Sequence, residues 1–270
     1  MKCSLISSTV SALLLATATA MGSAALPVSA QGLPEAEVTA KLDTILMLMA
    51  VDDKGQPRPV EATIDGRKVQ AYIAAISISG AEEVTAGKLY GLNQQVASGL
   101  RFAPVSLARF NLLLAPLLQQ NPKDLGVITP DPAQRAVAEQ LLIAQKVPAA
   151  QAKQIANLQP MVFCPEPGLL VSSNEGPDKG RQFVPCATEA DFVQSIVDRA
   201  KTESPQIAKS NPRVVAIPLN AFITYLRQEP AERVTQLKVV PSGRMVSLIQ
   251  QLNKPQPSPS PVPTTKPASR

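Results

Sequence analysis

Short apolar runs alternate with longer amphipathic stretches from about residue 45 to residue 252, a pattern that predicts strands alternating with helices. ILMLMAV, from Ile45, and PMVFC, from Pro160, are apolar runs of strand length, and each is followed by a turn and a second extended run. RFAPVSLARFNLLL, from Arg101, and RVVAIPLNAFITYL, from Arg213, each pass from an apolar strand-like run into apolar residues at helical spacing. The pattern predicts a fold of the α/β (α+β) class.

The same phrases occur twice in the same order, which indicates an internal duplication. A unit of about 110 residues repeats, from roughly 45 to 146 and from roughly 159 to 252, with offsets of 109 to 114 between matching positions. We expect two similar lobes, each a small sheet with packed helices. The matching positions are Met47 and Met161, Ser79 and Thr188, Arg101 and Arg213, and Pro130 and Pro241.

A hydroxyl followed three residues later by an acid predicts a helix start in both repeats. Ser79 precedes Glu82, and Thr188 precedes Asp191. Such a pair satisfies free backbone amides in the first turn, so we expect Ser79 and Thr188 to be N-caps.

The helices of the doubled phrase each carry a broad apolar stripe. Most of these side chains are expected to pack on their own sheets. Part of each stripe is expected to line a cleft between the two halves that binds extended apolar segments of other proteins. The candidate client surface consists of Phe110, Leu112, Leu113, Phe222 and Tyr225.

The two ends of the chain are predicted to lie outside the lobes. Residues 1–30 have an early lysine, an apolar stretch and small residues before Gln31, which is typical of a cleavable secretory signal and too short for a membrane span. Residues 253–270 alternate proline with small polar residues and are predicted to be an extended tail, either a spacer or a ligand for a proline-reading groove. The remaining chain divides into 31–146, a first lobe with an N-terminal helix, and 147–252, a second lobe.

Cys164 and Cys186 are the cysteines that remain once the signal is removed. In an exported protein an even number of cysteines makes a disulfide the natural hypothesis. Two buried apolar cysteines are the alternative, because spacing alone does not establish the distance between them.

The composition of the chain excludes several classes of catalytic and binding site. The chain has 45% hydrophobic residues, no histidine, and no GxxxxGK phosphate loop, which excludes histidine-based catalysis, histidine metal sites and this class of nucleotide site. Acid pairs such as Asp52-Asp53 and Glu82-Glu83 are expected to be surface or helix-end charges. The chain has 26 lysine and arginine residues against 21 acidic residues, and these cations are spread along the chain. Only 3% of its residues are aromatic. Both features argue against nucleic-acid binding. We predict a protein that is not an enzyme and uses no cofactor or metal.

In its repeated strand and helix phrases the chain resembles the 22-kDa intermembrane-space component of the chloroplast inner-envelope translocon, Tic, and its cyanobacterial periplasmic relatives. The resemblance rests on LMLMAVDDKGQPRPV, PVSLARF, QPMVFC and VPCATEADF, and it covers roughly residues 35 to 252. The run ISISGAEEV, the two cysteines and the proline-rich tail depart from the family pattern. The resemblance implies two lobes with pseudo-twofold symmetry and apolar pockets.

The resemblance also implies a function in protein translocation. It favours a periplasmic, chaperone-like factor for precursor or outer-membrane proteins, with unfolded chains and an outer-membrane Omp85-type insertase as partners. An architectural module that docks one fixed envelope partner is the alternative, and an exported hydrolase using serine, lysine and carboxylates is a more distant one. The thylakoid lumen remains an alternative to the periplasm, a peripheral contact with a membrane stays open, and the oligomeric state is not predicted.

Overall fold

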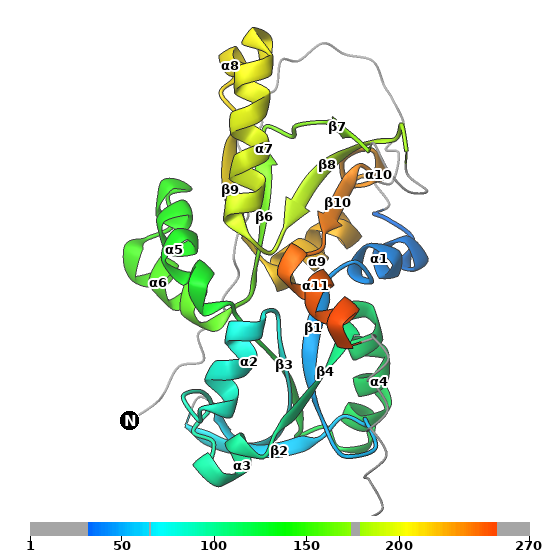
Figure 1. Cartoon of the computed structure of the whole chain (residues 1–270), viewed down its shortest axis with the longest axis vertical. Coiled ribbons are helices and arrows are strands. Elements are labelled where there is room, and N and C mark those ends of the chain that lie inside the picture. Colours follow the sequence, from blue (N-terminus) through cyan, green and yellow to red (C-terminus); the bar gives the residue numbers. More distant parts are fainter. Residues whose placement is uncertain (1–31, 65, 174–178, 253–270) are drawn as a thin grey trace, which may run out of the picture.

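A computed structural model describes residues 32–64, 66–173 and 179–252 of the chain. The predicted signal, 1–30, and the predicted tail, 253–270, lie outside the described residues. Helix α1 (Glu35–Leu42) precedes two five-stranded sheets, each with its own set of helices (Figure 1).

The first sheet lies in the lower lobe of Figure 1 and has the order β2-β3-β1-β4, with β5 paired to β3. Its strands are β1 (Leu46–Val51), β2 (Pro59–Ile64), β3 (Arg67–Ala75), β4 (Arg101–Ser106) and β5 (Leu125–Thr129). The helical segments of this repeat are α2 (Ile78–Thr85), α3 (Gln94–Ser98), α4 (Leu107–Gln120), the 3-10 turn η1 (Pro132–Gln134) and α5 (Arg135–Ala144).

The second sheet has the order β10-β8-β6-β9, with β7 paired to β8. Helix α6 (Ala149–Leu158) joins the two repeats. The strands of the second sheet are β6 (Met161–Glu166), β7 (Val171–Ser172), β8 (Gln182–Ala187), β9 (Arg213–Pro218) and β10 (Leu237–Val240). Its helices are α7 (Ala190–Glu203), α8 (Pro205–Ser210), α9 (Leu219–Gln228), α10 (Ala231–Val234) and α11 (Gly243–Leu252).

The two sheets have the same topology, which confirms the two-lobed α+β fold and its duplication. In each repeat the first strand pairs antiparallel with two others: β1 with β3 and β4, and β6 with β8 and β9. In each repeat the last strand runs parallel to the same neighbour, β5 to β3 and β10 to β8. Parallel pairing requires a crossover connection, and α4 and α9 lie on the paths that provide it.

The strand registers correct one of the matches made from the sequence. Leu48 pairs with Ala75 and Phe163 pairs with Ala187, so Leu48 corresponds to Phe163 at an offset of 115 instead of 114. A shift of one residue in a strand exchanges the two faces of the sheet. Met47 therefore corresponds to Val162, and both side chains lie in the same core cluster.

The helix starts predicted at Ser79 and Thr188 are also wrong. The N-cap of α2 is Ser77, whose Oγ accepts a hydrogen bond from the backbone N–H of Gly80, and the N-cap of α7 is Glu189, which makes no side-chain cap. The true N-caps are offset by 112 residues instead of 109. Two hydroxyls compete at the first start, and Ser79 instead donates to Asp131.

The last helix of each repeat packs against the sheet of the other repeat. Helix α5 contributes Ala138 and Leu142 to the cluster around Phe163 of β6. Helix α11 contributes Met245 to the cluster around Leu48 of β1. Figure 1 shows α5 beside the second sheet and α11 above β1 and β4. The predicted segments 31–146 and 147–252 are therefore interleaved, because each gives one helix to the partner lobe.

The edge strands β4 and β9, which pair with β1 and β6, are each protected against pairing with a further strand. The amide of Gln145 accepts a hydrogen bond from the backbone N–H of Ala216 in β9 and donates to its carbonyl, at 2.8 and 3.1 Å. Ala216 pairs with Phe163 and Pro104 pairs with Leu48, so Pro104 is the equivalent position in β4. Proline has no backbone N–H to offer an incoming strand.

Candidate functional site

Helices α4 and α9 present the apolar stripes that the sequence singles out, and both begin at the end of a strand. The Ser106 side chain caps α4 by accepting from the backbone N–H of Arg109, whereas Pro218 stands at the N-cap of α9. The buried residues repeat at i, i+3 and i+7 in both helices, as expected for one helical face. They are Leu107, Phe110 and Leu114 in α4, and Leu219, Phe222 and Leu226 in α9.

Phe110 and Phe222, predicted as part of a client surface, belong to the core. Their exposed fractions are 2% and 1%, and both lie in one cluster that also includes residues of both sheets. Neither ring offers surface to another protein in this structure. The stripes do not simply pack on their own sheets, because the cluster is shared between the lobes and holds them together.

Helix α1 fills the space between α4 and α9 where the sequence predicted a cleft. Val38 and Leu42 of α1 are buried in the shared cluster. The Glu35 carboxylate forms an ion pair with Arg227 of α9 at 2.7 Å, and the guanidinium lowers the pKa of this carboxyl. The helix that precedes the repeats thus closes the interface between them.

The other three candidate residues lie at the edge of this cluster or outside it. Leu113 and Tyr225 occupy equivalent positions in α4 and α9, and both are half-buried against the cluster. Burial raises the pKa of the Tyr225 hydroxyl, with a further contribution from Glu229. Leu112 is 64% exposed. Pro116 lies inside α4 and has no N–H to donate to the Leu112 carbonyl, so the helical hydrogen bond between these two residues is missing in this turn.

Further large apolar side chains are exposed on helices that the sequence did not single out. Leu158 on α6 is 61% exposed, and Ile143 on α5 and Leu252 on α11 are exposed as well. Leu112 and Leu158 are the two large apolar side chains with the greatest exposed fractions among the described residues.

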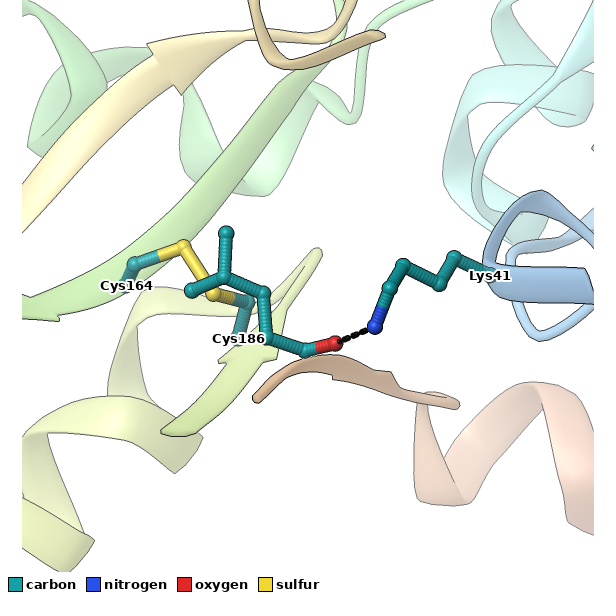
Figure 2. The surroundings of a disulfide bond; sticks show 4 residues. Lys41, Cys164 and Cys186 are labelled. Carbon is teal, nitrogen blue, oxygen red and sulfur yellow. Dashed lines mark hydrogen bonds between the residues drawn. A yellow bond between two sulfur atoms is a disulfide. The ribbon is translucent and has the colours of Figure 1, made fainter. Parts of the chain in front are cut away.

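A disulfide joins Cys164 of β6 to Cys186 of β8 (Figure 2). The sulfur atoms are 2.09 Å apart, and both residues are buried in the shared cluster. Beside it, the Lys41 ammonium of α1 donates hydrogen bonds to the carbonyls of Thr235 and Leu237 at 2.8 and 2.5 Å. Burial lowers the pKa of Lys41. Lys41 therefore ties α1 to the segment that enters β10.

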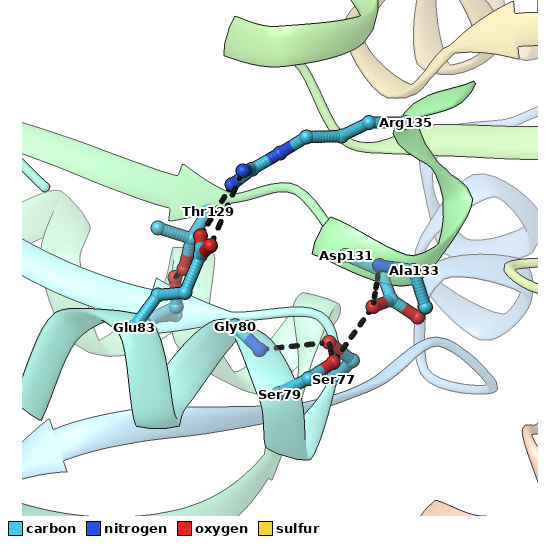
Figure 3. A network of polar contacts seen from close by, with 9 residues as sticks. Ser77, Ser79, Gly80, Glu83, Thr129, Asp131, Ala133 and Arg135 are labelled. Carbon is cyan, nitrogen blue, oxygen red and sulfur yellow. Dashed lines mark hydrogen bonds and ion pairs between the residues drawn. The ribbon is translucent and has the colours of Figure 1, made fainter. Parts of the chain in front are cut away.

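A polar network lies where α2 meets the turn before α5 (Figure 3). The Ser79 hydroxyl donates to Asp131 at 2.8 Å, and the same carboxylate accepts from the backbone N–H of Ala133. Glu83 and Arg135 form two hydrogen bonds at 2.5 and 3.3 Å, with both side chains largely buried. These contacts fasten α5 to the first lobe as it crosses to the second.

Three of the four acids considered from the sequence make structural contacts. Asp52 accepts from the backbone N–H groups of Lys54 and Gln56, and these hydrogen bonds lower the pKa of its carboxyl. Asp53 pairs with Arg101. Glu83 is held by Arg135, as described above. Glu82, the fourth of these acids, lines a cavity at this junction.

The equivalent junction in the second repeat carries Glu189, which accepts a hydrogen bond from the hydroxyl of Ser242 at 2.5 Å. The two junctions meet around a cavity of about 230 Å³. It is lined by Ser77, Ile78, Ser79, Glu82, Asp131, Glu189, Ser242, Arg244 and Met245. In the part of the chain that the structure describes, no group of three histidine, cysteine or acidic residues is placed to hold a metal ion.

Comparison with known proteins identifies the fold. No family model matches the chain, and no curated protein matches it. A solved structure of Tic22 from Anabaena, described as a protein-transport protein, is similar with a TM-score of 0.60 at 16% identity, over 83% of this chain and 100% of that one. Tic22 from Plasmodium falciparum is similar with a TM-score of 0.57 at 14% identity, over 80% of this chain and 97% of that one. The chain has the fold of Tic22, which confirms at the level of the fold the resemblance seen in the sequence.

Within the described ranges, none of the helices combines the length and the apolar character needed to cross a membrane.

Proposed function

We propose that this chain assists protein translocation as a non-enzymatic, chaperone-like factor in the periplasm, where it holds precursor or outer-membrane proteins for delivery to an Omp85-type insertase. The observation that carries the proposal is the likeness to Anabaena Tic22, a protein-transport protein, over the whole length of that structure. The predicted secretory signal supports the location, and the composition without histidine supports a binding function.

Exposed apolar side chains supply the surface for such binding. Because Phe110 and Phe222 are buried, the contact is assigned instead to Leu112 on α4 and Leu158 on α6, with Leu113 and Tyr225 at the margin of the core. Leucines that are exposed singly are ordinary on protein surfaces, so the proposal requires only a weak contact from each of them. Weak and broad binding suits a factor that must release unfolded clients.

The test is the aggregation of a urea-unfolded outer-membrane β-barrel protein after dilution, followed by light scattering. The chain from Gln31 onward is added at an equal molar amount. We expect suppression by the wild type and a clear loss of suppression in the double variant Leu112→Ser, Leu158→Ser. Thr224→Ser is the matched control, because Thr224 occupies in α9 the position of Leu112 in α4 and is also exposed.

An architectural role, in which the chain docks one fixed envelope partner, predicts a different result. In that case no client is held, and cross-linking in the envelope captures a single partner at fixed stoichiometry. Absence of suppression for several unrelated clients would refute the chaperone-like proposal.

A further inference from the structure

The two exchanged helices, α5 and α11, are equivalent in the duplication but are held very differently. Helix α5 buries Ala138 and Leu142, is backed by α6, and is fastened at its two ends by Arg135 and Gln145. Helix α11 buries only Met245. With the residues that the structure describes, α11 forms no ion pair. A polar contact stands at its start, where the hydroxyl of Ser242, the residue before α11, donates a hydrogen bond to Glu189.

The surface under α11 is apolar and belongs to the outer face of the first sheet and to α2. We call it the α11 groove. It is formed by Leu46, Leu48, Ala75, Ile78, Ala81 and Phe102. Leu48, Ala75 and Ala81 are buried, while the other three are half-buried even with α11 in place.

Helix α11 fills this groove incompletely. A surface depression of about 380 Å³, open to solvent, lies between Ile78 and the side of α11 that carries Leu248. The 230 Å³ cavity described above lies on the other side of Arg244. Both depressions are open to solvent, and Met245 is the one residue of α11 that is buried. Helix α11 is therefore held less firmly in its groove than α5, which buries Ala138 and Leu142.

The occupant itself defines what the groove accepts. Helix α11 places Met245, Leu248 and Ile249 in the groove, at i, i+3 and i+4, the spacing by which amphipathic helices dock in apolar grooves, while Leu252, at i+7, is exposed. The cation of α11, Arg244, faces a rim that carries Glu82, Asp131 and Glu189. The rim favours a cation near the start of a bound helix and disfavours an acid there.

We propose that the α11 groove binds amphipathic helical segments of other polypeptides that carry a cation at their amino-terminal end, and that α11 occupies the groove as an exchangeable placeholder. The proposal deepens the proposed function, on which it rests for the identity of the partner as a client segment. Binding in trans then requires displacement of α11 in cis, so the apparent affinity depends on how firmly α11 is held.

The experiment measures binding of a fluorescein-labelled peptide with the sequence of residues 241–252 to the chain from Gln31 onward, by fluorescence anisotropy. Met245→Ser in the protein removes the one buried contact of α11, and we expect the peptide to bind at least about tenfold more tightly than to wild type. Gly243→Ala should do the opposite. Its Cβ would meet nothing within 4 Å, and the substitution restricts the undocked chain, so binding should weaken about two- to fivefold.

Gln250→Lys is the matched control, because Gln250 is exposed on α11 and the two residues have similar helix propensities. A peptide carrying serine at the positions of Met245 and Leu248 should not bind any variant. Far-UV circular dichroism checks that each variant folds, and Ile249→Ser, at a half-buried position, replaces Met245→Ser if that variant does not. Equal peptide affinity across all variants overturns the proposal, and so does the absence of peptide binding to Met245→Ser or Ile249→Ser.

The client aggregation assay, run on the same variants, separates this proposal from the proposed function. If the peptide binds in the predicted order but no client is held, the groove proposal stands and the chaperone-like function fails. If clients are held equally by all variants and the peptide binds none, the function stands and the groove proposal fails.

Discussion

Replacement of Phe222 by alanine tests whether the doubled phrase builds the core or binds clients. Phe222 is 1% exposed and lies in the cluster shared by the two lobes. Removing a fully buried phenylalanine ring costs about 3–5 kcal/mol, from lost transfer free energy and from the cavity left behind. For a folded unit of about 200 residues, each kcal/mol lowers the melting temperature by about 2–4 °C, so we expect a decrease of roughly 6–20 °C.

The assay is urea unfolding followed by circular dichroism, with the free energy of unfolding extrapolated to water. Leu112→Ala is the control, because this exposed leucine of the equivalent helix should change the free energy of unfolding by no more than about 0.5 kcal/mol. A loss below about 1 kcal/mol for Phe222→Ala, with an unchanged denaturant slope, would refute the burial argument. Such a result combined with lost client binding would restore Phe222 to the client surface.

Three further predictions concern the contacts that join the elements. Replacing both bonded cysteines by alanine should lower the free energy of unfolding by about 3 kcal/mol, the entropy expected for a loop closed over 22 residues, measured by urea unfolding with oxidised wild type as reference. Gln145→Ala leaves the N–H and carbonyl of Ala216 without their partner and should lower the free energy of unfolding by about 2–3 kcal/mol. Gln145→Glu should recover part of this stability. An unchanged free energy of unfolding in both variants would show that the edge of β9 does not need the Gln145 side chain. Glu35 has a lowered pKa because Arg227 stabilises its charged form, so the ion pair stabilises the fold above the ordinary glutamate pKa of about 4.3 and the effect is lost as the pH falls through the lower folded-state value. The free energy of unfolding of the wild type should exceed that of Glu35→Gln by less than about 1 kcal/mol at pH 7, and the difference should shrink as the pH falls below about 4.3. A difference that grows in acid would contradict this sign.

Local patterns in the sequence identify the apolar faces correctly but not the surfaces that cover them. The spacing of Leu107, Phe110 and Leu114 predicts one buried helical face, and the structure buries all three. Whether the face meets its own sheet, the other lobe or a client depends on segments far away in the chain. Here α1, which lies outside the duplication, covers these faces. The eight residues of α1 do not by themselves predict that it packs between α4 and α9.

The match between the repeats shows the same limit at the level of register. Offsets taken from similar letters placed Met47 opposite Met161, whereas hydrogen bonding places Leu48 opposite Phe163. Methionine, leucine and valine are interchangeable in an apolar strand, so composition alone cannot detect a shift of one residue. The connection between the first and third strands is three residues shorter in the second repeat, counting from Leu48 to Ala75 and from Phe163 to Ala187, and this difference accounts for the change from 115 to 112.

The sequence by itself determined the class of fold, the duplication, the apolar faces of α4 and α9 and the absence of histidine chemistry, because periodicity, repetition and residue type are properties of the chain. Only the tertiary structure decided that α5 and α11 exchange lobes, that α1 closes the interface, and that Phe110 and Phe222 are core residues while Leu112 is exposed. The physical reason is that an apolar stripe lowers the free energy by the same amount per area whichever apolar surface covers it. The choice among such surfaces depends on shape and on contacts between elements that are not neighbours in the sequence, such as Met245 of α11 and Leu48 of β1.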